Sequence, residues 1–199
     1  FDLLVRSGCR YLLIGFESVS QRTLNKMAKG FNKEDDYEEL MRTLHKAGIS
    51  VQGCFVFGFD EDGPDVFEQT VDRVQELKID IPRYSIYTPY PGSRLFERLQ
   101  AEGRLLSTDW GDYDTMHVVF RPKQMSPVQL YEGFRWAYRE TFRLRRILTR
   151  TFKWGMGFPI TFVGNLTYRI FVRRLFFEPG FEMPLTALPS PRGLDGNPR

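Results

Sequence analysis

The 199-residue sequence has little of what marks several common protein classes. It contains two cysteines, Cys9 and Cys54, which lie in separate apolar segments without the paired spacing of a disulfide framework or a zinc site. No signal peptide or uninterrupted apolar span of membrane length is present. No phosphate-binding loop, dinucleotide fingerprint or nucleophile beside its base is found either. These absences predict a cytoplasmic globular protein with no metal site of its own.

Charge of one sign is also lacking. The chain has 28 basic and 25 acidic residues and a formal net charge of +3, so its composition does not favour a nucleic-acid partner. The two signs are nevertheless unevenly distributed, because carboxylates crowd the middle of the chain and arginines load its last third. A hydrophobic content of 42% is typical of a globular protein with a sizeable core.

The segment 51–64, VQGCFVFGFDEDGP, is the centre of the predicted fold. Its nearly continuous apolar run from Cys54 to Phe59 predicts a parallel strand buried on both faces, followed by an acidic loop and a helix. Ligands bind at the carboxyl ends of such strands, so a site is expected there. Gly53 and Gly58 either allow a ligand to approach closely or only relieve crowding.

Strands and helices alternate on both sides of this segment. Strands are predicted at 10–17 and 82–88, and helices at 32–47, 65–77 and 93–103. Strict alternation predicts a parallel sheet with right-handed crossovers. Three strands cannot close a barrel, and Phe1 precedes a helix that already ends at Gly8. The sequence is therefore expected to be a piece of a longer protein.

Several helix starts are predicted from capping residues. Asn32 is expected to cap its helix, and Asp65 with Glu68 resembles a capping box. Ser126, followed by proline and then Gln129, is a stronger start for a helix that reaches about residue 153 with a basic outer face.

The carboxy-terminal half divides into three further regions after the strand–helix unit of residues 1–104. Residues 105–125 are expected to be irregular apart from a strand at 117–120, and residues 126–183 to be helical, basic and aromatic. Residues 184–199 are expected to be disordered. Within the second region, the segment 158–177 either packs on the body of the protein or lies in a membrane interface.

Several side chains near the strand ends are candidates for chemistry. Glu17 directly follows a strand, and Lys29 is placed to meet a carboxylate of a ligand. Backbone groups from Phe57 to Asp60 are candidates for holding a planar ring. Three successive carboxylates at 60–62 point in different directions, which does not favour a metal site. His117 is either a proton-transfer residue or the partner in a structural hydrogen bond.

Three segments in this order resemble a known family: IGFESVSQRTLNKMAKGF, GISVQGCFVFGFDEDGPD and RYSIYTPYPGSRLFERL. Together they resemble the second half of the radical S-adenosylmethionine (radical SAM) enzyme core, in the class associated with a cobalamin (B12)-binding domain. The later run DWGDYDTMHVVFRPKQMSPVQL is similar to the same class. The resemblance covers residues 2–153.

This resemblance implies the fold and the cofactors. The implied fold is α/β: the carboxy-terminal half of a partial (β/α)6 TIM-like barrel with parallel strands, followed by a mainly helical region. Such enzymes cleave S-adenosylmethionine at a 4Fe-4S cluster, and this class also carries cobalamin on an upstream domain.

The resemblance also implies roles for individual residues. Glu17 matches a position that contacts the ribose or methionine part of S-adenosylmethionine. Lys29 stands where many relatives have an arginine for the methionine carboxylate, and a lysine meets that group as a point charge. The positions that match the adenine pocket are Phe57, Gly58, Phe59, Asp60, Tyr87, Thr88 and Pro89.

The sequence departs from the family in lacking the three-cysteine cluster motif and the glycine-rich segment that holds the cofactor's amino group. Thiolates hold such clusters, so the cluster ligands and the rest of the barrel are expected upstream of Phe1, and the chain alone is expected to be inactive.

The resulting hypothesis is a fragment of a cobalamin-dependent methyltransferase or related carbon-modifying enzyme, acting on a small hydrophobic or lipid-like substrate. Two alternatives stay open. One is a non-catalytic half-barrel that serves as a binding or scaffold subunit. The other is an adaptor that binds peripherally to the inner membrane surface.

Overall fold

A computed structural model describes residues 1–27, 32–151 and 157–177, with the backbone alone for 157–160 and 175–177. Lys29 and the expected disordered segment 184–199 lie outside the described residues. Along the chain the elements are α1 (Asp2–Arg6), β1 (Tyr11–Glu17), α2 (Gln21–Lys26), η1 (Glu34–Asp36), α3 (Tyr37–Lys46), β2 (Ser50–Phe57), α4 (Val66–Glu76), β3 (Ile81–Ile86), α5 (Arg94–Ala101), η2 (Trp110–Asp112), α6 (Pro127–Thr141), α7 (Leu144–Thr151) and α8 (Gly157–Phe177).

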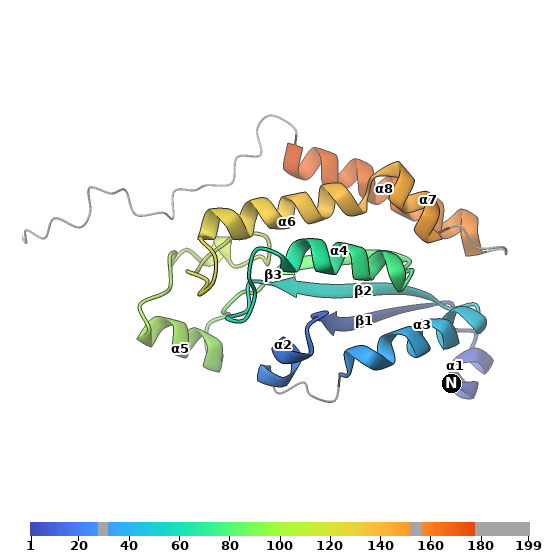
Figure 1. Ribbon diagram of the computed structural model, residues 1–199, viewed down its shortest axis with the longest axis horizontal. Coiled ribbons are helices and arrows are strands. Elements are labelled where there is room, and N and C mark those ends of the chain that lie inside the picture. The colour runs from blue at the N-terminus through green and yellow to red at the C-terminus, as the bar shows by residue number, and fades with distance from the viewer. Residues whose placement is uncertain (28–31, 152–156, 178–199) are drawn as a thin grey trace, which may run out of the picture.

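The three strands form a parallel sheet in the order β1-β2-β3, which confirms the predicted α/β class (Figure 1). Tyr11 pairs with Ser50 at one end, and Phe57 pairs with Ile86 at the other. The carboxyl ends of all three strands therefore lie at one edge of the sheet. Among the described residues no further strand joins it, and the partial barrel stays a prediction.

One face of the sheet carries the core. Phe16 packs against Tyr37 of α3 with ring centroids 4.7 Å apart, Phe57 against Phe67 of α4 at 4.9 Å, and Tyr84 against Tyr138 of α6 at 5.1 Å. These aromatic pairs fix one helix against each strand in turn.

The opposite face is partly exposed, because burial alternates along β2. The prediction that β2 is buried on both faces is therefore wrong for the described residues. Gln52 and Cys54 are half-buried there, and Leu13 of β1 is 60% exposed.

The strand glycine Gly53 accommodates the protein's own side chains. A Cβ atom at this position would lie 2.8 Å from Cγ2 of Ile79 and 3.2 Å from the ring of Phe16. Relief of crowding, one of the two interpretations left open for this glycine, therefore explains it.

Of the predicted helix starts, the strongest is confirmed, the one at Asp65 is correct in position but lacks the capping bond, and the one at Asn32 is wrong. The Ser126 side chain accepts from the Gln129 N–H while the Gln129 side chain accepts from the Ser126 N–H, a complete capping box. Asn32 does not cap α3, because the 3₁₀ turn η1 intervenes and its side chain donates to the carbonyl of Gly15 instead. Asp65 precedes α4 without a capping bond, since its carboxylate accepts from Gln69.

Two further expectations are corrected between residues 105 and 151. The predicted strand at 117–120 is reduced to a single antiparallel bridge between Leu105 and Phe120. The single long helix predicted after Ser126 is two helices, because α6 ends before Phe142 and α7 starts at Leu144.

Helix α8 packs on the body of the protein, as one of the two interpretations of segment 158–177 predicted (Figure 1). Asn165 is fully buried and donates to the carbonyls of Asp80 and Thr161. It also accepts from Arg150, which is itself fully buried and donates to the carbonyl of Thr141. Burial lowers the pKa of Arg150 to about 10. No helix among the described residues has the length and apolar content needed to cross a bilayer.

The outer edge of β3 is closed by side chains and a loop. The hydroxyl of Tyr138 accepts from the N–H of Tyr84 at 3.1 Å and donates to its carbonyl at 2.8 Å. Farther along the strand, the N–H of Ile86 donates to the carbonyl of Thr115 at 2.7 Å. The outward backbone groups of Tyr84 and the N–H of Ile86 are thus satisfied without a further strand.

Candidate functional site

Glu17 ends β1 in an unusual conformation. Its φ is +67°, a left-handed value that is rare for a glutamate, and the pairing with β2 shifts register between Gly15 and Glu17. The carboxylate folds back toward the strand, since a Cβ atom at Gly15 would lie 2.7 Å from Glu17 Oε1. Strain of this kind often marks a functional position.

The turn after β2 is shaped by Asp62. Its Oδ2 accepts from the N–H groups of Gly58 and Phe59, both at 3.0 Å, and Oδ1 lies 3.5 Å from the Thr23 hydroxyl of α2. Asp62 is only 4% exposed, and this burial raises its pKa to about 6 against the opposing effect of the backbone hydrogen bonds. One carboxylate thereby connects the turns that follow β1 and β2.

Gly58 is required by the backbone and by packing. Its φ is +101°, and a Cβ atom there would lie 2.9 Å from Cδ2 of Leu130 and 3.2 Å from Cζ of Phe120. The glycine therefore makes room for α6 and the segment before it, as Gly53 makes room for the core.

Few backbone groups of this turn are left for a ligand. Besides the two N–H groups held by Asp62, the carbonyl of Phe57 accepts from Tyr87, that of Phe59 from Asp62 and that of Asp60 from Gln124. Among the described residues, the carbonyl of Gly58 and the N–H of Asp60 have no hydrogen-bond partner. The turn thus offers one acceptor and one donor two residues apart.

The carboxylate of Asp60 is engaged in ion pairs. Oδ1 lies 2.7 Å from Arg104, and Oδ2 lies 3.4 Å from Arg98 and 3.3 Å from Lys123. Burial alone would raise the pKa of Asp60, but the hydrogen bonds and charges of Arg104 and Lys123 outweigh burial and lower it. The Asp60 carboxylate thus links the turn after β2 to α5 and to the segments that follow α5.

Aromatic rings line the ends of β2 and β3. Phe59 and Tyr87 lie with ring centroids 4.5 Å apart, and Tyr87 meets Phe120 edge-on at 6.4 Å. Burial raises the pKa of the Tyr87 hydroxyl, so this group is protonated at neutral pH. Thr88 and Pro89 are buried, and the Thr88 hydroxyl donates to the carbonyl of Ile86.

His117 lies in a loop fixed by Asp114. Its Nδ1 is 2.8 Å from Asp114 Oδ2, while Oδ1 of the same carboxylate accepts from the N–H groups of Met116 and His117. Burial would raise the pKa of Asp114, but the hydrogen bond from His117 and those from the backbone lower it. The histidine therefore takes part in a structural hydrogen bond, and its role in proton transfer stays a prediction.

The structure thus brings together the ends of all three strands, with Glu17, the 57–60 turn and the 87–89 segment at one edge of the sheet. Lys29 lies outside the described residues. Sequence reasoning missed Asp62 and Thr23 as the residues that hold the turn. Asp62 was grouped with its acidic neighbours, although an acidic residue three or four positions after a strand-end glycine is spaced to accept from the turn amides.

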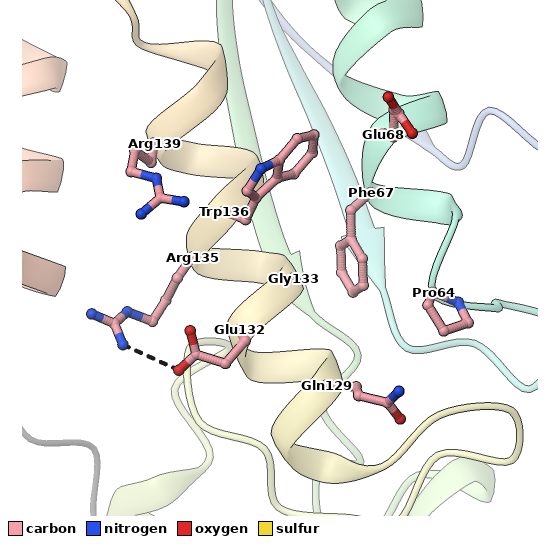
Figure 2. A pocket seen from close by; sticks show the side chains of 9 residues that line it. All are labelled: Pro64, Phe67, Glu68, Gln129, Glu132, Gly133, Arg135, Trp136 and Arg139. Atoms are coloured by element: carbon pink, nitrogen blue, oxygen red, sulfur yellow. Dashed lines mark hydrogen bonds and ion pairs between the residues drawn. The ribbon is translucent and has the colours of Figure 1, made fainter.

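A pocket of about 600 Å³ lies elsewhere, on the helical layer between α4 and α6 (Figure 2). It is lined by Pro64, Phe67, Glu68, Gln129, Glu132, Gly133, Arg135, Trp136 and Arg139. At its base Gly133 admits the ring of Phe67, because a Cβ atom there would lie 2.1 Å from Cε2 of that ring. No residue of the strand-end site lines this pocket.

No group of three or more histidine, cysteine or acidic side chains is placed to hold a metal ion in the part of the chain that the structure describes. Cys9 and Cys54 are both free thiols. Burial raises the pKa of Cys54, with Arg83 opposing, so that thiol is not activated as a ligand or nucleophile.

Comparison with known proteins finds relatives over most of the chain. A bacteriochlorophyllide d C-12(1)-methyltransferase of Chlorobaculum tepidum is 37% identical over 176 residues, which is 87% of this chain and 37% of that protein. A bacteriochlorophyllide d C-8(2)-methyltransferase of the same organism is 31% identical over 149 residues, or 74% of this chain and 33% of that protein.

A third relative is an anaerobic magnesium-protoporphyrin IX monomethyl ester cyclase of Cereibacter sphaeroides, 27% identical over 156 residues, or 77% of this chain and 24% of that protein. A family model described as a domain of unknown function, DUF4070, matches residues 93–159, from the cap of α5 into α8. The chain spans 37% or less of the length of these three relatives.

Proposed function

We propose that this chain is the carboxy-terminal part of a radical S-adenosylmethionine enzyme that modifies a carbon centre, most closely a methyltransferase. The observation that carries the proposal is the convergence of Glu17, the 57–60 turn and the 87–89 segment at the carboxyl edge of one parallel sheet. These are the three segments whose order resembles the radical SAM core. The similarity to methyltransferases and a cyclase supports carbon modification as the outcome.

The adenine ring of S-adenosylmethionine would bind against the β2 turn. Its amino group is a hydrogen-bond donor and the adjacent ring nitrogen is an acceptor, which complements the carbonyl of Gly58 and the N–H of Asp60. The rings of Phe59 and Tyr87 provide apolar surface beside this turn. Asp62 acts through the turn: by accepting from two of its amides it fixes where the remaining groups point.

Glu17 would accept hydrogen bonds from the ribose hydroxyls or the amino group of the methionine part. The left-handed backbone at Glu17 turns its carboxylate over Gly15, at the same edge as the adenine turn. Lys29, on the segment after β1, would meet the methionine carboxylate as a point charge.

The iron–sulfur cluster does not fit the thiols of this chain. Such a cluster needs three thiolates from the protein beside S-adenosylmethionine, whereas the sequence has two cysteines and the thiol of Cys54 is held protonated by burial. The cluster would supply the electron that cleaves S-adenosylmethionine, and its ligands, like any cobalamin, would come from other parts of the complete protein.

A flat, largely apolar substrate suits the proposal. The two methyltransferases and the cyclase carry tetrapyrroles in their names, so a tetrapyrrole is the first substrate class to test. The partly exposed face of the sheet, with Leu13, Gln52 and Cys54, would face that substrate inside the completed barrel.

The test uses the full-length gene product that contains this chain, reconstituted anaerobically with iron and sulfide. S-Adenosylmethionine binding is measured by equilibrium dialysis, and 5′-deoxyadenosine is measured after reduction with dithionite. We expect Glu17→Gln to weaken binding by roughly 10- to 100-fold, the range for losing hydrogen bonds to a charged group. The matched control Glu39→Gln changes an exposed glutamate on α3 and should bind as the wild type does.

Cleavage in the wild type, with weak binding in Glu17→Gln alone, would support the radical enzyme and the place of Glu17 in its cofactor pocket. A full-length protein that neither binds nor cleaves S-adenosylmethionine would contradict the proposal and favour the scaffold alternative.

A further inference from the structure

Helix α8 has two different faces. Thr161, Asn165 and Val172 are buried against the body of the protein and lie along one side of the helix at spacings of four and seven residues. Asn165 fixes this side through its bonds to Asp80 and Arg150. The orientation of the opposite side is therefore fixed as well.

The opposite side is exposed and largely apolar. Val163 is 58% exposed, Ile170 56% and Phe171 53%. Thr167 and Arg174, four residues after Val163 and Ile170, are exposed on the same stripe. A helix with apolar residues on both faces normally has a partner on each of them, and none of the described residues covers this one.

Helix α7, which packs against α8, repeats this composition. Leu144 is 49% exposed and Leu148 45% exposed, one turn apart. Arg145 is exposed beside them. Two neighbouring helices therefore present large apolar side chains next to arginines.

The charge of this region has one sign. Between Glu140 and Glu178 the sequence has no acidic residue and eight basic ones: Arg143, Arg145, Arg146, Arg150, Lys153, Arg169, Arg173 and Arg174. Some are engaged, since Arg143 and Arg146 pair with Glu140 and Arg150 is buried. Among the described residues, Arg145, Arg173 and Arg174 form no ion pair, so their charge is open to an anionic partner.

Exposed apolar side chains beside cations, without carboxylates, are the composition of helices that lie in the surface of an anionic bilayer. We propose that α7 and α8 dock on such a surface, with Ile170 and Phe171 at the boundary of the acyl chains and Arg173 and Arg174 at the phosphates. The helices lie on the membrane and do not cross it. This inference is independent of the proposed function, because the face is remote in sequence from the residues at the strand ends.

The test is sedimentation of the full-length gene product with vesicles of phosphatidylcholine, with and without phosphatidylglycerol. We expect binding to the anionic vesicles and little to the neutral ones. Arg173→Gln/Arg174→Gln should lower the lipid partition coefficient by about 30-fold at low salt, since each cation near the surface contributes about fivefold. The control Arg6→Gln/Arg42→Gln removes the same charge from exposed sites on α1 and α3 and should leave binding unchanged.

A second variant tests the apolar contribution. Ile170→Ser/Phe171→Ser should release the protein from anionic vesicles, whereas Val128→Ser, at a 43% exposed position on α6, should not. Circular dichroism checks that each variant is folded. The proposal is overturned if the wild type does not bind anionic vesicles, if it binds neutral ones equally, or if both α8 variants bind like the wild type. A dimer that forms without lipid and is lost in Ile170→Ser/Phe171→Ser would assign the face to a second copy and would also overturn it.

Discussion

The two borders of the sheet, formed by the outer edges of β1 and β3, differ in how their backbone N–H and carbonyl groups find hydrogen-bond partners. At β3, the hydroxyl of Tyr138 and the carbonyl of Thr115 bond to backbone groups of the strand. The side-chain amide of Asn165 donates to the carbonyl of Asp80, the residue before the strand. At β1, no strand of the described residues pairs along the outer edge, and Tyr11 and Leu13 are 47% and 60% exposed. One border is therefore finished by residues far along the chain. Along the other, the carbonyls of Tyr11 and Gly15 accept from the side chains of Cys9 and Asn32, and no strand of the described residues pairs with it.

The largest expected effect comes from removing the buried amide at the closed border. Asn165→Ala removes the amide that donates to the carbonyl of Asp80 and the oxygen that accepts from Nη2 of the buried Arg150, which keeps only its bond to the carbonyl of Thr141. We expect the free energy of unfolding to fall by about 3–5 kcal/mol, measured by urea denaturation. Asn25→Ala, at an exposed position on α2, is the control and should change it by less than about 0.5 kcal/mol. Equal effects of the two variants would show that the β3 border does not depend on α8.

Tyr138→Phe removes one atom from the same border. The N–H and carbonyl of Tyr84 both lose their partner in a buried place, so we expect a loss of about 2–4 kcal/mol by the same measurement. The ring packing against Tyr84 and Phe134 is kept. A loss below 1 kcal/mol would mean that water reaches the edge and replaces the hydroxyl.

The central strand has no free edge, and its terminal turn responds to pH instead. Burial raises the pKa of Asp62 to about 6 from an ordinary value of 3.8. The pKa of Asp62 is higher in the folded state than in the unfolded state, so protonated Asp62 favours the folded state. This contribution to the free energy of unfolding is complete below about pH 4 and is lost as the pH rises through about 6. The stability of the wild type relative to Asp62→Asn should thus fall by on the order of 2–3 kcal/mol over that window. Unfolding curves at several pH values test this, and a difference that grows with pH would show that the amide bonds outweigh burial.

The smallest effect is expected at the open border. Tyr11→Phe removes a hydroxyl that donates to Gln52 on the partly exposed face. Since water replaces this bond, we expect a change within about 0.5 kcal/mol. Tyr138→Phe makes the same chemical change at a hydroxyl that bonds to strand backbone, whereas the Tyr11 hydroxyl bonds to a side chain. A loss as large as that of Tyr138→Phe would show that the effect at Tyr138 does not come from the backbone of β3.

Local signals in the sequence were sufficient for much of the fold. The three strands, the parallel order and the capping box at Ser126 follow from periodicity, alternation and capping chemistry. The cap assigned to Asn32 failed because its side chain donates to the carbonyl of Gly15. Asp65 does precede α4, but its carboxylate accepts from the side chain of Gln69 and not from a backbone N–H of the first turn. Such competition depends on which groups the fold brings near, and propensity does not contain that information.

The candidate site was predictable at the level of segments and less so at the level of atoms. Its three segments lie at one edge because parallel strands end together. Asp60 pairs with Arg104, whereas Asp62 accepts from the amides of the turn. These different roles depend on the path of the chain after residue 94, which short-range sequence patterns do not specify. The double bond of Tyr138 to Tyr84 is likewise a contact between distant segments.

The hydroxyl of Tyr138 has a consequence for assembly. A strand border whose donor and acceptor are both occupied cannot template another chain, so it is insulated against aggregation and domain exchange. Any strand added to this sheet, from the same polypeptide or from another, must extend it along β1. Growth of the sheet therefore has a single direction, and one phenolic oxygen contributes to setting it.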